Sequence, residues 1–209
     1  MNNNVLQMTK VALWVVMTFS LVQIGCGPRG AVSENRVYVI PQADKEGLSI
    51  AFIETPAGSQ QTLAFNPKDF SFDTLNYQQG GIRTDYLPYP LASGFLSGGS
   101  TDSLEKIPVW VLSRNTLPGD TMSINLLGMI EYRDQGVLKT EFIGIPEDSI
   151  LQTVPSTRFR DFIIAYDPVK FMFETWLKNR HGIGSVTQLS WQDEDKATLY
   201  LDKLHNKMD

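Results

Sequence analysis

The sequence predicts a mainly β domain with some α-helix, in which a small barrel or curled sheet has two carboxyl-terminal helices packed outside it. Two observations lead to this fold class. Segments with alternating or continuous apolar and β-branched residues follow one another through most of the chain, and turn sequences separate the clearest of them. Helical spacing of apolar residues is clear in two segments near the carboxyl terminus.

The composition is that of an ordinary globular protein with one domain. The chain has 209 residues, of which 42% are hydrophobic and 20% are charged. Its formal net charge of -5 argues against DNA or RNA as a partner. The single cysteine excludes an intrachain disulfide framework, and two histidines, His181 and His205, are too few for a multi-histidine metal site. The common nucleotide-loop, nucleophile-elbow and zinc-protease motifs do not occur in the sequence.

The amino-terminal segment has the pattern of an export signal. Met1–Lys10 is polar with one positive charge, and Val11–Gly25 carries no charge but is too short for a comfortable membrane span. Residues 1–25 followed by Cys26 resemble a bacterial lipoprotein signal peptide, which implies lipidation of Cys26. Residues 26–35 suit a tether. We expect an exported protein, lipid-anchored on the periplasmic or outer-membrane side of a bacterial envelope; the alternative is an uncleaved anchor with an incidental cysteine.

Strands are expected over much of residues 36–145. Arg36–Ile40 and Leu48–Glu54 alternate or run apolar, whereas Tyr77–Ser100 is rich in Tyr, Pro and Gly and is expected to be a long surface loop or a pair of turns. Turns are predicted at residues 117–120 (LPGD) and 134–136 (DQG). The other expected strands, two weaker and then three clearer, are Gln61–Phe65, Phe70–Leu75, Ile107–Ser113, Thr121–Tyr132 and Val137–Ile145.

Two helices are expected after the strands. Asp167 and Pro168 suit an N-cap and a first helical position, and this helix should run to Asn179 and stop at Gly182. The second helix is expected to begin near Trp191, where three acidic residues follow and favour its amino end. Its buried stripe is Ala197, Tyr200, Leu201 and Leu204.

Several segments, taken in order, resemble motifs of the soluble inorganic pyrophosphatase family. Residues 52–56 (FIETP) resemble its I-E-x-P strand, and residues 89–96 (YPLASGFL) resemble its Y-P-x-N-Y-G-Y-I loop. Residues 117–130 match a stretch P-G…G-v-l, residues 134–146 have the length of D-x-x-x-x-D-x-K-l-i-a-v-P, and residues 171–191 resemble the last helix and its following G-W. This resemblance implies a small five-stranded, OB-like β-barrel of the inorganic-pyrophosphatase type over residues 36–209, with the two helices outside.

The resemblance also implies a metal site from which this sequence departs. The family holds several Mg²⁺ ions with clustered carboxylates, and water bound to these ions becomes the nucleophile. Across the D-G-D-P-x-D signature the chain reads EKIPVW, so that Glu105 remains while Ile107 and Trp110 replace the other two acids. Mg²⁺ needs hard oxygen ligands, which isoleucine and tryptophan cannot supply. Trp110 is expected to fill the former metal cavity.

The next motif shows a second departure. Asp134 is kept, but Lys139 stands where the family has its second Asp, and Glu141 stands where it has Lys. This exchange preserves a possible ion pair and places a cation where a metal should bind. We therefore expect no cofactor.

Six positions still match the family. Glu54, Glu105 and Asp134 are the remnant of the metal ligands, and Arg83, Tyr89 and Lys178 are the remnant of the phosphate-binding residues. Their plainer interpretation is that they persist as surface or packing residues.

Three functions follow from the resemblance. The first is a catalytically inactive, pyrophosphatase-fold lipoprotein that acts as an accessory or scaffold subunit of an envelope protein complex. The second keeps Mg²⁺-dependent hydrolysis of diphosphate, with Glu54, Glu105 and Asp134 holding a reduced metal set. The third is a module that binds a phosphate-like anion through Arg83, Tyr89 and Lys178 without cleaving it.

Overall fold

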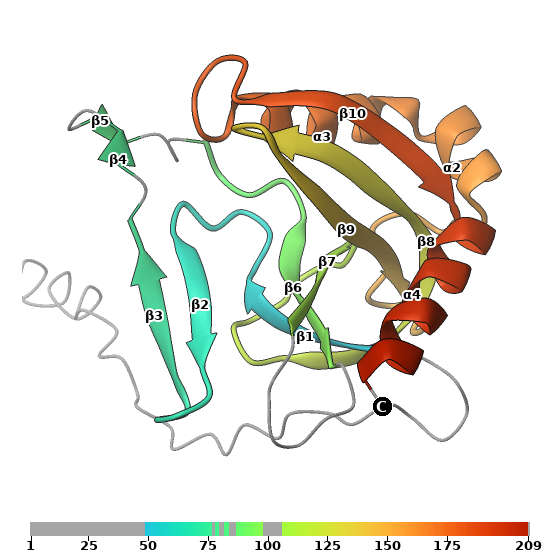
Figure 1. The fold of residues 1–209 in the computed structure, drawn as a ribbon. Helices are drawn as coiled ribbons and strands as arrows, with labels where there is room; N and C mark the ends of the chain where they lie inside the picture. The colour runs from blue at the N-terminus through green and yellow to red at the C-terminus, as the bar shows by residue number, and fades with distance from the viewer. Residues whose placement is uncertain (1–48, 77, 80–81, 84–86, 98–105, 209) are drawn as a thin grey trace, which may run out of the picture. The chain divides into compact units, whose positions relative to one another are not determined.

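The computed structural model describes residues 49–76, 78–79, 82–83, 87–97 and 106–208, all within one compact unit, Tyr38–Asp209. Strands come first and helices are gathered toward the carboxyl end (Figure 1). The strands are β1 (Ser49–Thr55), β2 (Thr62–Asn66), β3 (Ser71–Leu75), β4 (Gln78–Gln79), β5 (Ile82–Arg83), β6 (Ala92–Ser97), β7 (Lys106–Val111), β8 (Thr121–Asp134), β9 (Val137–Pro146) and β10 (Val186–Asp193). The helices are α2 (Phe159–Ala165), α3 (Asp167–Asn179) and α4 (Glu194–Met208).

Five strands form a partially closed ring. The hydrogen-bonded order is β1-β6-β7-β9-β8, and β8 also pairs with β1, which brings the two ends of this order together. All neighbours are antiparallel except β7 and β9, which are parallel. The predicted fold class, a small five-stranded barrel with helices outside, is confirmed.

The length of β8 explains how the ring also carries a sixth strand. One edge of β8 pairs with β9 along almost its whole length, from Ile124 to Asp134. The other edge is shared, since Thr121 to Ile124 pair with β1 and Gly128 to Asp134 pair with β10. A single strand thus closes the ring at one end and extends the sheet at the other.

The two faces of the sheet are covered by different helices. Side chains of successive strand residues point to opposite faces, so Trp110 and Ile143 pack under α2 and α3 while Val109 and Phe142 pack with α4. The short β2–β3 hairpin has its own small core, in which Phe65 and Phe72 pack against Phe52 and Phe95 of the ring. These two arrangements place the ends of β1, β7, β8 and β9 around the candidate site.

Three elements differ from the sequence prediction. The predicted surface loop Tyr77–Ser100 contains β6, a ring strand, because Gly94 allows β6 to approach β1 so closely that a Cβ there would lie 1.9 Å from the Phe52 carbonyl oxygen. Trp191 lies in β10, so the last helix begins at Glu194 and not near Trp191. The helix α2 was not predicted, and three helices therefore follow the ring instead of two.

Other predicted elements agree with the structure. The helix α3 spans Asp167–Asn179, close to the predicted bounds, but its N-cap is Tyr166, so the prediction of Asp167 as the N-cap is wrong. Gly182 follows the helix with a φ of 112° that favours glycine. The predicted leader 1–25, tether 26–35 and strand Arg36–Ile40 lie outside the described residues. Within the part of the chain that is described, no helix has the length and apolar character needed to cross a membrane.

Candidate functional site

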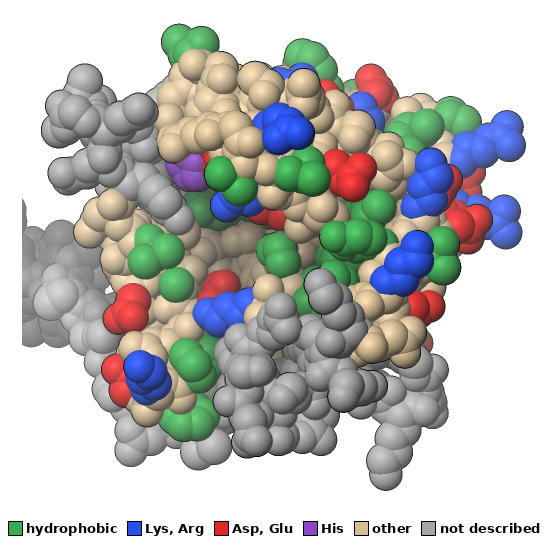
Figure 2. Space-filling model, in the orientation of Figure 1, with side chains coloured by type: hydrophobic (Ala, Val, Ile, Leu, Met, Phe, Trp, Pro, Cys, Tyr) green, Lys and Arg blue, Asp and Glu red, His purple; other side chains and the backbone are tan. Residues whose placement is uncertain are grey.

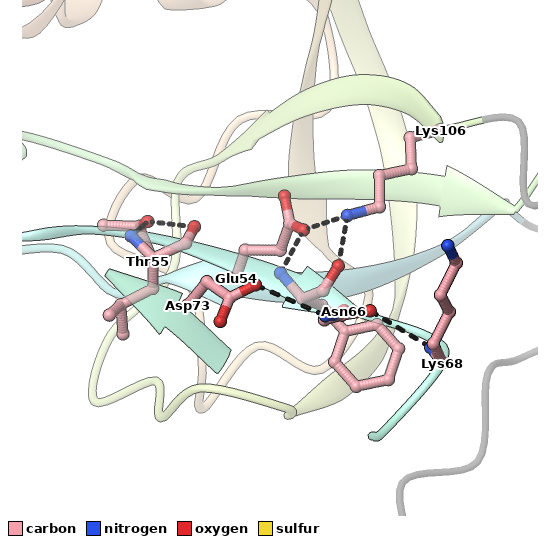
Figure 3. A network of polar contacts seen from close by, with 8 residues as sticks. Glu54, Thr55, Asn66, Lys68, Asp73 and Lys106 are labelled. Atoms are coloured by element: carbon pink, nitrogen blue, oxygen red, sulfur yellow. Dashed lines mark hydrogen bonds and ion pairs between the residues drawn. The ribbon is translucent and has the colours of Figure 1, made fainter. Parts of the chain in front are cut away.

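Glu54, near the end of β1, has a lysine as its counter-ion. The Nζ atom of Lys106, the first residue of β7, lies 2.6 Å from Glu54 Oε1 and 2.7 Å from the backbone oxygen of Phe65. Glu54 Oε1 also accepts a hydrogen bond from the Phe65 N–H at 2.8 Å. Figure 3 shows Lys106 reaching from β7 toward both groups, and the ammonium lies 5.0 Å from the ring centre of Phe95. The sequence resemblance placed a glycine of the signature at Lys106, so this cation is additional to the family pattern.

Glu141, on β9, is the centre of a second polar cluster, which is almost completely buried. Its Oε2 accepts a hydrogen bond from the indole N–H of Trp110, and its Oε1 accepts one from the Tyr132 hydroxyl at 2.6 Å. The Arg180 guanidinium donates to the Tyr132 hydroxyl oxygen at 2.9 Å and lies 3.8 Å from Glu141 Oε1. Both oxygens of the Glu141 carboxylate therefore have hydrogen-bond partners, whereas Nε of Arg180 is buried without one among the described residues.

Aromatic rings enclose the Arg180 guanidinium. Its central carbon lies 5.8 Å from the ring centres of Trp110 and Trp176, and 5.9 Å from that of Tyr132. Burial lowers the pKa of Arg180, but Glu141 and the other acidic and phenolic groups nearby together outweigh this effect, and the pKa is raised above its ordinary value. Burial and the Glu141 carboxylate raise the pKa of Tyr132. Arg180 is therefore a permanent cation, and Tyr132 is a neutral hydrogen-bond donor.

Asp134, at the end of β8, faces a histidine. Its Oδ2 lies 3.4 Å from His181 Nδ1, and the carboxylate is buried. Burial and the neighbouring Arg180 guanidinium lower the pKa of His181, although Asp134 opposes this change. His181 is therefore neutral at pH 7, with Asp134 as its polar neighbour.

Of the phosphate-binding remnant, Tyr89 and Lys178 have described side chains, and both contact residues other than these acids. Tyr89 is buried, stacks on Trp110 with ring centres 5.9 Å apart, and has its hydroxyl 2.6 Å from the Thr62 hydroxyl. Lys178 is exposed on α3 and lies 3.5 Å from Glu174 of the same helix. Arg83 belongs to β5, whose side chains are not described, and Glu105 and Cys26 lie outside the described residues.

The described acids of the metal-ligand remnant, Glu54 and Asp134, are not part of a metal-binding group. Glu54 and Asp134 belong to separate clusters, one with Lys106 and the other with His181. Among the described side chains, no three from His, Cys, Asp and Glu lie close enough together to hold a metal ion. Figure 2 shows the face of the molecule hollowed near its centre, with both acidic and basic side chains at the rim. A metal placed at either acid would meet a neighbouring cation or an imidazole instead of further carboxylates.

Three residues of these clusters were not found by sequence reasoning. Lys106 and Arg180 come from segments far from their partners, and their Glu54 and Tyr132 partners are 52 and 48 positions away in sequence. The sequence around His181 contains no motif that would mark it as a functional residue. The ion pair expected from the exchange at Lys139 and Glu141 is instead formed by Glu141 with Arg180. The only available signal was the unusual charge at Lys106 within the signature.

Comparison with known proteins supports the fold. No family model matches the chain. An inorganic pyrophosphatase of Aquifex pyrophilus is 29% identical over 89 residues, which are 41% of this chain and 50% of that protein, so the match spans half the length of this curated relative. The structure of an inorganic pyrophosphatase from Thermus thermophilus is similar with a TM-score of 0.62 and 19% identity, over 81% of this chain and 97% of that chain. A Neisseria gonorrhoeae inorganic pyrophosphatase gives a TM-score of 0.58 and 17% identity, over 81% and 96% of the two chains.

The order of strands in the ring, the helices outside it and these similarities agree with one another. The chain has the fold of the inorganic pyrophosphatases.

Proposed function

We propose that this protein is a diverged pyrophosphatase that does not hydrolyse diphosphate and acts as a scaffold or accessory subunit of a bacterial envelope complex, anchored there by a lipid on Cys26. One observation carries the loss of activity: cations of the chain itself neutralise the acids around the former site. Lys106 lies 2.6 Å from Glu54, and Arg180 lies 3.8 Å from Glu141.

Electrostatics gives the reason. A divalent ion bound to Glu54 would be repelled by the ammonium of Lys106 at the same oxygen. Among the described side chains, no further acids join Glu54 in a group that could share the charge of the ion. At the second cluster, Trp110 already uses one oxygen of Glu141, and Tyr132 uses the other. Loading a metal there would break two buried hydrogen bonds and bring the ion close to Arg180.

Phosphate release from diphosphate tests the loss of activity. The full chain, incubated with diphosphate and millimolar Mg²⁺ or Mn²⁺, should release phosphate no faster than buffer, while an active pyrophosphatase serves as the positive control. Glu54→Gln and Asp134→Asn variants prepared in parallel distinguish activity of this chain from activity of a contaminating enzyme. Metal-dependent release that disappears in either variant would establish the enzyme and overturn the proposal; release equal in all three preparations belongs to a contaminant.

Metabolic labelling tests the lipid anchor. Cells that express the full chain with a fatty-acid analogue should incorporate the label, and the Cys26→Ser variant should not. Because Cys26 is the only cysteine in the sequence, the variant removes every site for a thioether-linked lipid. Equal labelling of both forms, or none in either, would contradict a lipoprotein.

The outward face of α3 supports a scaffold role. Phe171 and Met172 are 68% and 47% exposed, while Phe173, Trp176 and Leu177 of the same helix are buried. Aromatic and methionine side chains are enriched in protein interfaces. A helix with apolar residues on both faces packs one face on the core and leaves the other available to a partner. We expect a subunit of the envelope complex to contact this face.

Co-purification from solubilised membranes tests the scaffold role. The tagged full chain should recover one or more defined proteins, and Phe171→Asp with Met172→Asp should lose them. Ile150→Asp is the matched control, because Ile150 is also a strongly exposed aliphatic residue but lies in the turn after β9. Recovery of the chain alone, or equal recovery with both variants, would contradict contact through α3.

A further inference from the structure

Two turns lie side by side at one end of the sheet and form a single tip, which we call the β8–β9 tip. The turn between β8 and β9 and the loop before β10 are joined by a hydrogen bond from the Gln135 N–H to the Ser185 oxygen at 3.0 Å. Val186, the first residue of β10, pairs with Asp134, the last residue of β8. Backbone pairing therefore joins the two turns.

Three aliphatic side chains extend from this tip into solvent. Val137, Leu138 and Ile183 are 61%, 60% and 95% exposed. Turns normally carry polar or small residues, and here Gly136 and Gly184, with φ of 85° and 75°, do have that role. The aliphatic residues beside them contribute nothing to the core, so their exposure has no explanation within the fold.

Positive charge surrounds the aliphatic residues. Arg133 and Lys139 are exposed, whereas the nearby acid, Asp134, is buried against His181. The Arg133 guanidinium is fixed at the base of the tip, because Nε donates to Gln188 Oε1 at 2.8 Å and one terminal nitrogen donates to the Gly136 oxygen at 3.0 Å. A cationic tip on a chain of net charge -5 is a local feature with a sign opposite to that of the whole protein.

We propose that the β8–β9 tip inserts into the surface of an anionic lipid bilayer. Val137, Leu138 and Ile183 would enter the boundary between headgroups and acyl chains, and Arg133 and Lys139 would contact lipid phosphates. Charge complementarity favours lipid over protein here: the tip combines aliphatic residues with cations and has no aromatic residue, unlike the interface-type face of α3. This inference rests on the proposed function, which gives the protein a lipid anchor and therefore a membrane nearby. A flexible tether over residues 26–35 would hold the domain within about 20 Å of the anchoring lipid.

A fluorophore placed at the tip tests insertion directly. In the full chain with Cys26→Ser, an Ile183→Cys substitution provides the only thiol, which is labelled with the environment-sensitive dye NBD. With phosphatidylcholine vesicles containing one quarter phosphatidylglycerol, the emission should shift to the blue and increase. With phosphatidylcholine alone, or with phosphatidylglycerol vesicles at high salt, the shift should be smaller. The same dye at Ile150→Cys is the matched control and should keep its emission in water.

Variants without the two cations measure the electrostatic contribution to vesicle binding. Arg133→Gln with Lys139→Gln should weaken binding to the anionic vesicles by about thirtyfold, on the scale of two surface cations. Val137→Ser with Leu138→Ser and Ile183→Ser should abolish binding that is attributable to the tip, measured with the dye at a neighbouring position, Gln135→Cys. All these positions are exposed, and circular dichroism of each variant should match that of the parent chain.

The outcomes separate this inference from the proposed function. If the label at position 183 remains in water while the protein binds vesicles, the leader is responsible and the tip proposal is wrong. A shift caused by a co-purified protein instead of by vesicles would assign the tip to a protein interface and also overturn it. Neither result bears on the two tests of the proposed function, which are the absence of phosphate release and the recovery of partners through α3. Those two tests give the opposite outcome only if the proposed function itself is wrong.

Discussion

The chemistry of each acid in the former site depends on which side chain lies next to it. Glu54 keeps the identity expected of a metal ligand, but Lys106 and the Phe65 N–H take its Oε1 atom. Asp134 also keeps its identity, and its neighbour is the His181 imidazole. Glu54, with the Lys106 cation beside it, gains little from a metal ion, and the metal would first have to displace that cation.

At the scale of the residue, Lys106 should stabilise the fold as the counter-ion of Glu54. Replacing Lys106 by Met should lower the free energy of unfolding by about 1–3 kcal/mol, because Glu54 and the Phe65 oxygen then lose a charged donor in a partly buried place. Urea unfolding followed by circular dichroism measures this change. Lys68→Met is the control, since Lys68 donates a hydrogen bond to Asn66 through its backbone N–H, and the substitution should cost under about 0.5 kcal/mol. Equal losses for both variants would contradict the role of Lys106.

His181 should make stability depend on pH. Burial and Arg180 lower its pKa in the folded protein, while Asp134 raises it and Lys139 lowers it further. In the unfolded chain the pKa returns to its ordinary value, so the unfolded state binds a proton first. The contribution of His181 is therefore complete above about pH 6.5 and is lost as the pH falls from there to the lower, folded pKa.

The measurement is urea unfolding at several pH values between about 8 and 5. The parent chain should lose stability across this range, and His181→Asn should lose less over the upper part of it. Carboxylates shared by both proteins contribute equally, so the difference between the two curves isolates His181. A constant difference between the curves at all pH values would show that the imidazole does not titrate in the way its burial requires.

At the scale of the element, the loop after α3 brings a cation to the buried end of β9. Arg180 connects this loop to β8 through Tyr132 and to β9 through Glu141. Trp110 of β7 donates to the same carboxylate. One cluster of four side chains thus links three strands of the ring to the end of a helix.

Removing Arg180 alone should lower the free energy of unfolding more than removing Arg180 and Glu141 together. Arg180→Met should lower the free energy of unfolding by about 3–5 kcal/mol, because Glu141 stays buried with its nearest cation gone. Arg180→Met combined with Glu141→Leu should be less destabilised than Arg180→Met alone. A double-mutant cycle from urea unfolding gives the coupling energy directly. Additive effects would mean that the two side chains stabilise the fold independently.

Gly94 should be indispensable for the pairing of β6 with β1. A Cβ at this position would lie 1.9 Å from the Phe52 backbone oxygen, and a backbone atom in a paired strand cannot move aside as a flexible side chain can. Gly94→Ala should destabilise the protein by at least about 3 kcal/mol. Gly58→Ala has open space around its Cβ and a φ of 81°, so only backbone strain of about 1 kcal/mol is expected. Thermal unfolding of both variants compares the two costs, and a mild effect of Gly94→Ala would show that β1 and β6 can separate.

At the scale of the whole molecule, stability should not depend on divalent metal. Ligands that bind only the folded state raise the melting temperature, and an intact set of Mg²⁺ sites would do so strongly. Because internal cations already neutralise Glu54 and Glu141, millimolar MgCl₂ should change the melting temperature by less than about 1 °C relative to NaCl of equal ionic strength. A large rise that is specific to Mg²⁺ or Mn²⁺ would indicate a metal site that includes residues outside the two clusters.

Much of the fold could be predicted from the sequence because its signals are local. Periodicity and turn residues identified β1, β7, β8, β9 and α3, and the ordered resemblance of short motifs identified the ring. The prediction failed where local signals were weak. The ring strand β6 is short and follows a segment rich in Tyr, Pro and Gly, and β10 has few buried residues to show a strand pattern.

The sequence by itself determined the class of fold, because periodicity, turn residues and the order of short motifs are local signals. It also determined that Ile107, Trp110 and Lys139 stand where the motifs it resembles have acids, because each residue's identity is a property of one position. Only the tertiary structure decided what the remaining acids contact. Lys106 meets Glu54 across 52 positions of sequence, and Arg180 meets Tyr132 across 48. The physical reason is that a charge acts over a few ångströms in space, and closure of the ring, not nearness in sequence, sets which charges come within that range.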